Sequence, residues 1–177
     1  VGGAILMNAG TRHGAVESVL EGIDVLEPPD RVRTLDRNQL FFGYRRLSWQ
    51  PAGSSGEHLF IVLSGRFALA PAAGIDPAAE FEAMLSRRWE TQPKGFSAGC
   101  VFKNPSADRA AGRLIDQAGL RGMAVGGARV SAVHANFIIN EKEASAADIL
   151  ELIRLVQKCV AERFRVWLEP EIRIVGE

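Results

Sequence analysis

The stretch Pro71-Ala-Ala-Gly-Ile-Asp-Pro77 divides the sequence at a domain joint. Proline and glycine interrupt regular structure, and this segment follows the clearest strand pattern in the chain, Phe60–Leu69. Asp76 is suited to cap a helix whose first residue is Pro77 and which runs to about Trp89. We therefore expect one unit before residue 75 and another after it.

The residues before this joint are predicted to form strands and turns. Two strand-like runs, Val19–Leu26 and Arg31–Leu35, flank Pro28-Pro29-Asp30, and this pattern favours a hairpin. The strand at Phe60–Leu69 is expected to follow a loop at Pro51–Gly56.

The residues after the joint combine helices with short strands. A helix is expected from about residue 107 to residue 118, with Gly119 suited to its C-terminal cap. Ser145-Ala-Ala-Asp148 is suited to cap the strongest helical pattern in the chain. A short buried strand is expected at Asn136–Asn140 and a last strand at Val166–Val175. Because helices and strands interleave, the predicted fold class is α+β.

Composition excludes several classes of partner. Of 177 residues, 47% are hydrophobic and 24% charged, as in ordinary globular proteins. Lys and Arg number 21, and Asp and Glu number 21, so the net charge is zero. We therefore expect no nucleic-acid partner, since such binding needs an excess of cations. No apolar run approaches the ~20 residues of a membrane span, and no signal-peptide pattern opens the chain.

The cysteines and histidines are few and scattered. Cys100 lies in a glycine-led loop and Cys159 on a helical pattern, so we expect free thiols and a cytoplasmic protein. His13, His58 and His134 form no pair at metal-ligand spacing. The sequence therefore predicts no metal site.

Two short segments carry the groups of proton-transfer chemistry. Ser97–Pro105 contains a thiol, a lysine and an amide at Cys100, Lys103 and Asn104, and Leu168–Arg173 contains a pair of carboxylates. Such groups suit acid–base chemistry on a polar, anionic substrate. For Cys100 the alternative is a small buried hydrophobe, although the nearby Lys103 favours an ionised or hydrogen-bonded thiol.

The carboxylates of the expected last strand have two interpretations. Alternation places Glu169, Glu171 and Arg173 on one face of the strand. A solvated edge strand is favoured by Pro170, which cannot donate to a ladder. In the functional interpretation, one carboxylate faces a cleft and does acid–base or electrostatic work.

Arginines follow an aromatic pair in Tyr44-Arg45-Arg46. Two adjacent arginines on a strand point to opposite faces, so one of them can reach inward. An inward arginine suits a carboxylate or a developing enolate, because its planar fork donates two hydrogen bonds together.

Two further candidates are weaker. Gly2-Gly3 and Asn8-Ala9-Gly10 form a glycine-rich turn pattern that could place backbone N–H groups against a phosphate. His134 precedes the short buried strand, where it is either a structural histidine or a substrate contact.

Taken together, these segments resemble the UDP-N-acetylenolpyruvoylglucosamine reductase (UDP-N-acetylmuramate dehydrogenase) family. The matching segments run in the family's order over essentially the whole chain. They are Val1-Gly-Gly-Ala4, Met7-Asn-Ala-Gly10, Phe42-Gly-Tyr-Arg45, Ala98-Gly-Cys-Val-Phe-Lys-Asn-Pro105, Ala111-Gly-Arg-Leu-Ile115, Gly126-Gly-Ala128, His134-Ala-Asn-Phe-Ile138 and Leu168-Glu-Pro-Glu171.

The resemblance implies a flavin-dependent reduction in peptidoglycan precursor synthesis. NADPH reduces a bound FAD, and hydride passes to the β-carbon of UDP-N-acetylglucosamine enolpyruvate. Protonation at the α-carbon then gives the lactyl ether of UDP-N-acetylmuramate.

The resemblance also implies roles for individual residues. Arg45 and Glu171 would stabilise charge on the substrate, and Cys100 stands where the family commonly carries a serine proton donor. A thiol is a stronger acid than an alcohol, so this replacement is chemically tolerable. Substrate contacts are expected from Lys103, Asn104 and His134, and FAD contacts from Gly2, Gly3, Asn8 and Gly10.

Some features depart from the family pattern. Leu47 replaces a common serine, and Thr11-Arg12-His13-Gly14 replaces an alanine-tyrosine-glycine run. The chain lacks an initial Met and the family's upstream flavin loop, so it resembles the C-terminal part of a longer enzyme.

By analogy with the family, the chain would divide into three parts. Residues 1–74 would be the remainder of a flavin-binding domain, residues 76–164 a substrate-binding domain and residues 165–177 a returning strand with Glu171. Two alternatives stay open. One is a non-catalytic nucleotide-sugar-binding module, and the other is a flavin oxidoreductase of the same fold with another substrate.

Overall fold

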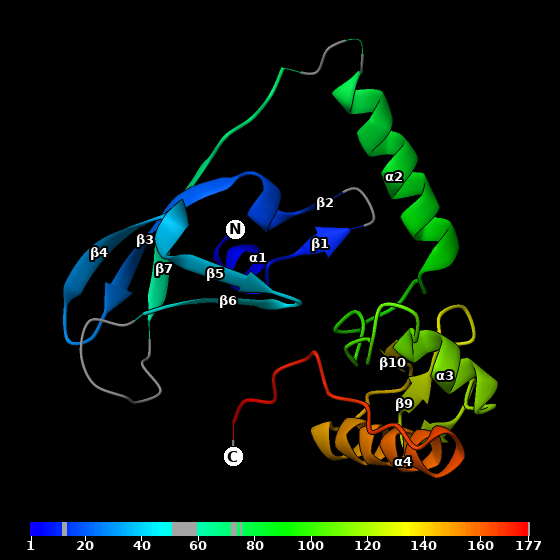
Figure 1. The fold of residues 1–177 in the computed structure, drawn as a ribbon. Helices are drawn as coiled ribbons and strands as arrows, with labels where there is room; N and C mark the ends of the chain where they lie inside the picture. The colour runs from blue at the N-terminus through cyan, green and yellow to red at the C-terminus, as the bar shows by residue number, and fades with distance from the viewer. Residues whose placement is uncertain (12–13, 51–59, 72–73, 75, 177) are drawn as a thin grey trace. The chain divides into compact units, whose positions relative to one another are not determined.

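The computed structural model describes all residues except 12–13, 51–59, 72–73, 75 and 177. The chain forms two compact units, Val1–Ala73 and Gly74–Glu177 (Figure 1). Helices and strands occur in both units, which confirms the expected α+β class.

A three-stranded antiparallel sheet organises the first unit. Its strands are β3 (Leu20–Glu27), β4 (Arg31–Asp36) and β7 (Ile61–Phe67), in the order β4-β3-β7. The hairpin predicted around Pro28-Pro29-Asp30 is confirmed, because β3 and β4 pair from Gly22↔Asp36 to Glu27↔Arg31. The strand predicted at Phe60–Leu69 is confirmed as β7, whereas the loop predicted before it lies outside the described residues.

Short elements complete the first unit around a small core. They are α1 (Gly2–Leu6), β1 (Gly10–Thr11), β2 (Gly14–Ala15), the 3-10 helices η1 (Val16–Ser18) and η2 (Arg37–Gln39), and the hairpin of β5 (Leu40–Gly43) and β6 (Arg46–Trp49). The buried core consists of Ile5, Leu20, Ile23, Val25, Leu35, Leu40 and Leu47. Leu47 is therefore a packing residue of the first unit.

The glycine-rich turn expected at the start of the chain is a helix instead. In α1 the Ile5 N–H donates to Val1 O at 3.1 Å and the Met7 N–H to Gly3 O at 3.0 Å. The Ile5 side chain is 1% exposed in the core of the first unit. Packing of this one residue outweighs the low helix propensity of the two glycines.

The second unit begins with α2 (Pro77–Thr91), as predicted from its cap. The Asp76 side chain accepts the Ala78 N–H at 2.9 Å, and Pro77 occupies the first turn. No residue of α2 is buried, so this helix contributes mainly surface.

The core of the second unit lies between two helices and a small sheet. The sheet has the order β10-β9-β8, from β8 (Ala124–Val125), β9 (Ala128–Val130) and β10 (Ile138–Asn140), and the helices are α3 (Ala111–Gln117) and α4 (Ala146–Phe164). The largest fully buried side chains are Phe102, Ile115, Leu152, Leu168, Val130, Val156 and Val160. The predicted strand at Asn136–Asn140 is confirmed in its last three residues.

Hydrogen bonds to the first residues of α3 and α4 explain where each helix begins. Ser145 and Asp148 form a reciprocal capping box at α4, which confirms that predicted start. Helix α3 begins at Ala111 rather than near residue 107, because the Asn104 Oδ1 accepts the Ala111 N–H at 3.0 Å. Gly119, at φ +78°, follows the end of α3 as expected.

The last strand predicted at Val166–Val175 does not form as a strand among the described residues. Instead the segment makes one bridge, in which the Lys103 N–H donates to Glu169 O at 2.8 Å and the Glu171 N–H to Val101 O at 2.7 Å. Pro170 lies opposite Phe102 in this bridge, and the two hydrogen bonds use the N–H groups of Lys103 and Glu171. Because no N–H is needed at residue 170, proline is tolerated there. The Gln157 amide further holds this segment by donating to Leu168 O at 2.9 Å.

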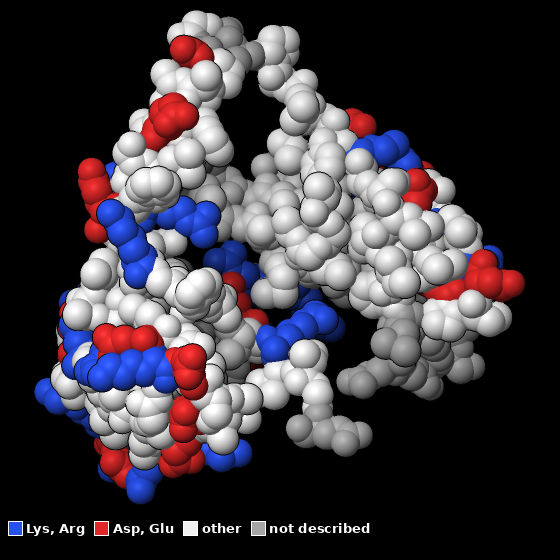
Figure 2. Space-filling view, turned by 180° about the vertical axis from the view of Figure 1, so that it is seen from behind, with Lys and Arg blue, Asp and Glu red and all other residues white. Residues whose placement is uncertain are grey.

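Charge is mixed over the surface of the second unit. On the face seen in Figure 2, acidic and basic side chains are interspersed over this unit. Within the described part of the chain, no helix is long and apolar enough to cross a membrane.

Candidate functional site

The loop that carries Cys100 is fixed by residues of the β9–β10 connection. Gly99 has φ +84°, a left-handed conformation that favours glycine, and it turns the chain into Cys100. Cys100 then bridges Phe137, and the Val101 N–H donates to Asn136 O at 2.8 Å. These contacts fix the position of the thiol-bearing residue in the second unit.

A pocket of about 340 Å³ lies beside this loop. We call it the Cys100 pocket. Its walls come from the loop, from α3 and the turn after it, and from the residues before β10. Its polar lining residues include Cys100, Asn104, Arg113, Asp116, Arg121 and His134. The structure therefore brings together three residues that the sequence singled out, namely Cys100, Asn104 and His134.

His134 is half-buried at the edge of this pocket. Its Nδ1 accepts the Asn136 N–H at 3.2 Å, and its ring meets the Phe137 ring edge to face with centroids 4.9 Å apart. Burial lowers the pKa of His134, and the positive charge of Arg121 lowers it further against an opposing backbone hydrogen bond. The lowered pKa favours the neutral form of the imidazole.

Arg121 and Asp116 form an ion pair on the pocket wall that sequence reasoning missed. The guanidinium contacts both carboxylate oxygens of Asp116, with Nη2 at 3.0 Å from Oδ2. The same guanidinium donates to the carbonyls of Ala132 and of Val133, the latter at 3.1 Å. Hydrogen bonding and the charge of Arg121 lower the pKa of Asp116 although desolvation opposes them. A separation of five residues across a helix end gives no recognisable sequence signal.

The other predicted residues of this unit make contacts that hold the fold, and Lys103 and Glu171 are not among the residues that line the Cys100 pocket. Lys103 forms an ion pair with Glu169, and the Asn104 side chain caps α3. Glu171 is half-buried, and its backbone N–H is bound to Val101 O. Both carboxylates therefore lie along the segment that pairs with the Cys100 loop.

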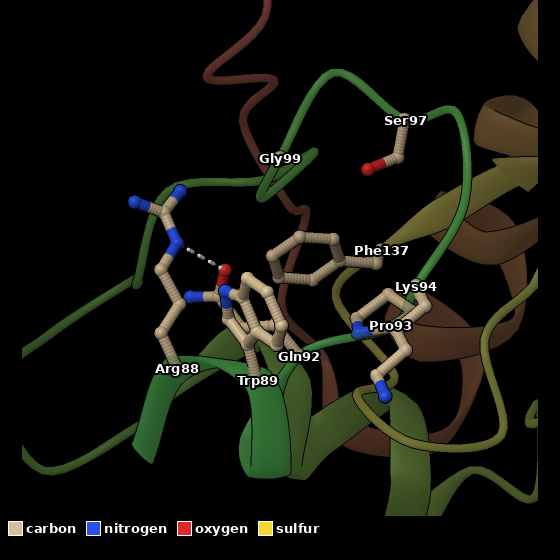
Figure 3. Close-up of a pocket in the computed structure, with 8 residues that line it drawn as sticks. All are labelled: Arg88, Trp89, Gln92, Pro93, Lys94, Ser97, Gly99 and Phe137. Atoms are coloured by element: carbon tan, nitrogen blue, oxygen red, sulfur yellow. Dashed lines mark hydrogen bonds between the residues drawn. The ribbon is translucent and has the colours of Figure 1, made fainter. Parts of the chain in front are cut away.

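A second pocket, of about 410 Å³, borders the other side of the same loop (Figure 3). We call it the Trp89 pocket. Ser97, Gly99 and Phe137 line it together with the end of α2. There the Arg88 Nε donates to the Gln92 Oε1 at 2.9 Å, and the Lys94 Nζ lies 5.9 Å from the Trp89 ring centroid.

The Trp89 pocket was not predicted from the sequence. Its cations and indole come from Arg88-Trp89 and Lys94, which stand either side of the helix end. Cations beside an exposed aromatic ring are a pattern that could have indicated binding of a nucleotide phosphate.

The first unit brings Asn8, Gly10 and Arg45 together. Buried Asn8 donates through Nδ2 to Gly43 O at 3.2 Å and accepts the Glu17 N–H at 3.0 Å. The Arg45 Nη1 lies 3.5 Å from Gly10 O.

Arg45 is not on a strand, which corrects the expectation of alternating strand arginines. It occupies the two-residue turn between β5 and β6 with φ +56°. Left-handed backbone is uncommon for a residue with a side chain and is enriched at functional sites.

The four residues predicted to contact FAD fit that group in part. Both ends of the Asn8 amide bind backbone groups of the first unit, so this side chain is engaged in the fold. A Cβ added at Gly2 would contact Val62, whereas one added at Gly3 would meet nothing within 4 Å. Gly3 is thus the position where a ligand could approach the backbone closely. Among the described residues, no group of three His, Cys, Asp or Glu could hold a metal ion.

Comparison with known proteins shows which class of protein the second unit is similar to. Residues 92–175 match the family described as UDP-N-acetylenolpyruvoylglucosamine reductase, C-terminal domain. The matched range includes the loop that carries Cys100 and the residues that line the Cys100 pocket.

Named relatives match over the whole length of the chain. It is 44% identical to the UDP-N-acetylenolpyruvoylglucosamine reductase of Desulfosudis oleivorans, over 100% of this chain and 57% of the relative. It is 43% identical to the reductase of Levilactobacillus brevis, over 100% of this chain and 56% of the relative. Over its whole length, the chain is similar to the C-terminal part of UDP-N-acetylenolpyruvoylglucosamine reductases.

A solved structure agrees with the sequence relatives. The crystal structure of UDP-N-acetylenolpyruvylglucosamine reductase from Thermus caldophilus superimposes with a TM-score of 0.76 at 40% identity. The match covers 98% of this chain and 59% of that chain. The chain thus spans somewhat more than half the length of the relatives it matches.

Proposed function

We propose that this chain serves the reduction of UDP-N-acetylglucosamine enolpyruvate to UDP-N-acetylmuramate, with FAD and NADPH, in cytoplasmic peptidoglycan precursor synthesis. The observation that carries the proposal is the Cys100 pocket, which gathers a thiol, an amide and a neutral imidazole beside one loop. Similarity to the UDP-N-acetylenolpyruvoylglucosamine reductases supports the same reaction.

Three residues carry the chemistry in this proposal. When bound, reduced FAD supplies the hydride for the β-carbon. The Cys100 thiol then donates its proton to the α-carbon, which completes the lactyl ether. Arg45 and Glu171 are proposed to stabilise the charge that develops on the substrate carboxylate and enolate, because preorganised groups do so without reorganisation.

In this proposal, the Trp89 pocket and the Cys100 pocket bind different parts of the substrate. The Trp89 pocket offers Arg88, Lys94 and an indole face, which suit the phosphates and base of a nucleotide. Asn104 and His134, which line the Cys100 pocket, are proposed substrate contacts, and Lys103, next to Asn104 in the chain, is proposed as a supporting contact.

A non-catalytic nucleotide-sugar-binding module is the second candidate. It is favoured by the Asn8 amide, whose two ends bind Gly43 O and the Glu17 N–H inside the first unit. In that candidate the Trp89 pocket binds the nucleotide sugar and no flavin is retained.

Flavin retention and turnover distinguish the two candidates. The chain is incubated with FAD and desalted, its visible absorbance spectrum is recorded, and NADPH oxidation is then followed with and without UDP-N-acetylglucosamine enolpyruvate. The reductase predicts a shifted flavin band and substrate-dependent oxidation of NADPH. A colourless chain that still binds the substrate in calorimetry would support the binding module instead.

A further inference from the structure

The His134 ring is oriented by a hydrogen bond from the backbone. Its Nδ1 accepts the Asn136 N–H at 3.2 Å, so that nitrogen presents a lone pair. In a neutral imidazole only one nitrogen can accept, and the proton then lies on Nε2. The fold therefore selects the Nε2–H tautomer of His134.

Asn136 links this ring to the loop that carries Cys100. The backbone oxygen of Asn136 accepts the Val101 N–H at 2.8 Å. Its side-chain Oδ1 accepts the Phe102 N–H at 3.0 Å, and its Nδ2 donates to Phe102 O at 2.8 Å. One polar group of Asn136 thus contacts His134, and the other three contact the two residues that follow Cys100.

Burial makes these hydrogen bonds consequential. Asn136 is 4% exposed, and Val101 and Phe102 are each 2% exposed. A buried polar group that loses its partner incurs its desolvation cost in full, so the four bonds tend to hold or fail together.

We propose that His134 is a positioning residue, which acts through Asn136 to fix the Val101–Phe102 backbone and thereby the placement of Cys100. This inference rests on the proposed function only for its catalytic meaning, because the positioning itself is a property of the folded chain. This positioning role uses Nδ1 and is separate from the substrate contact proposed for His134, which would use Nε2.

Protonation of the ring would work against this arrangement. A proton on Nδ1 would place two donors face to face at the Asn136 N–H. The charged groups that line the same pocket are Arg113 and Asp116 of α3 and Arg121 beyond it, with the Cys100 thiol opposite. Asp116 is already paired with Arg121, and the backbone hydrogen bond that favours a cationic ring is outweighed by burial.

Two variants separate positioning from substrate contact. In His134→Asn the side-chain oxygen can take the place of Nδ1 and accept the Asn136 N–H. In His134→Gln the longer side chain carries its polar atoms toward the place of Nε2. Positioning is therefore retained in His134→Asn and lost in His134→Gln, whereas a direct contact through Nε2 predicts the reverse.

The readouts need neither flavin nor turnover. Amide hydrogen exchange measures protection at Phe102 and Asn136, and iodoacetamide labelling followed by peptide mass spectrometry measures reactivity at Cys100, with Cys159 on α4 as internal reference. His134→Gln is expected to lower protection of both amides about tenfold and to change the Cys100 labelling rate several-fold, with Cys159 unchanged. His134→Asn is expected to stay within about twofold of the parent chain in both measurements.

Several outcomes would overturn the inference. One is unchanged amide protection in His134→Gln, and another is an equal loss in both variants. If His134→Gln does not fold, ¹⁵N spectra of the parent imidazole decide the matter, since a proton found on Nδ1 at pH 7 contradicts the proposed geometry. An inactive protein that shows the expected amide hydrogen exchange would contradict the proposed reaction and leave the positioning role supported.

Discussion

The Glu27 carboxylate accepts the indole N–H of Trp49, with Nε1 at 3.2 Å from Oε1. The Arg33 Nη1 also donates to Glu27 Oε1, at 2.9 Å. The buried Glu27 side chain on β3 therefore binds one residue of β4 and one residue of β6. Glu27 is 8% exposed. Burial by itself raises the pKa of Glu27, but the hydrogen bonds from Trp49 and Arg33 and the charges of Arg33 and Arg31 outweigh it and lower the pKa below its usual value.

Glu27→Gln should therefore destabilise the first unit. The amide keeps the side-chain shape but loses the charge that pairs with Arg33, and we expect a loss of about 1–2 kcal/mol in the free energy of unfolding. Urea unfolding followed by Trp fluorescence measures it. The exposed pair of Glu151 and Arg154, 3.6 Å apart, provides the control, because Glu151→Gln should change stability by less than about 0.5 kcal/mol. Equal losses in both variants would contradict the assignment.

The same carboxylate predicts a pH dependence. Because its pKa is lower in the folded state, Glu27 contributes stability that is complete above its unfolded pKa and is lost as the pH falls through the folded value. Parent stability minus Glu27→Gln stability should shrink as the pH is lowered from 6 towards 3. A difference that stays constant over that range would show that the carboxylate charge is not involved.

Local signals made part of this fold predictable. Asp76-Pro77 and Ser145 with Asp148 are caps within one turn of the helices that they begin, so α2 and α4 could be predicted from neighbouring residues. The β3–β4 hairpin was predictable for the same reason, since Pro28-Pro29 lies between two strand-like runs.

Distant pairings explain what the sequence could not predict. Lys103 pairs with Glu169, sixty-six residues away, and the Asn136 amide binds Phe102 across thirty-four. The Val166–Val175 pattern alternates like a strand, yet within the described part of the chain its one β-bridge is the pairing of Pro170 with Phe102. Resemblance to the family indicated Cys100, Asn104 and His134, but not that the Asn104 oxygen caps α3.

Two neighbouring glycines of α1 give a matched test of flavin binding. An added Cβ at Gly3 meets open space and one at Gly2 makes ordinary contact with Val62, so alanine at either position should fold normally. If FAD approaches the backbone here, Gly3→Ala should weaken its retention several-fold while Gly2→Ala does not. Flavin fluorescence titration with circular dichroism as the folding control measures both. Identical flavin affinities in the two variants would remove Gly3 from the cofactor site.

The capping box of α4 predicts a stability change in the second unit. Ser145 Oγ accepts the Asp148 N–H at 3.1 Å, and Asp148 Oδ2 accepts the Ser145 N–H at 2.9 Å. Ser145→Ala leaves a helix N–H without its acceptor and should cost about 1 kcal/mol. Ser145→Thr retains the hydroxyl and should lose much less. Thermal unfolding of the three chains by far-UV circular dichroism tests the ranking, which equal melting temperatures would refute.

The thiol of Cys100 makes the sharpest prediction about chemistry, because serine and alanine separate proton donation from packing. Cys100→Ser keeps a donor of similar size and should keep activity, whereas Cys100→Ala should lower turnover roughly 100-fold or more in the flavin-loaded protein. Alkylation should inactivate the parent chain and spare Cys100→Ser, since a thiolate reacts and a hydroxyl does not. Cys159→Ser, on α4, serves as the matched control and should remain as sensitive to alkylation as the parent. Stopped-flow oxidation of NADPH with the enolpyruvyl substrate measures turnover, and an alanine variant of near-normal rate would place the proton donor elsewhere in the site.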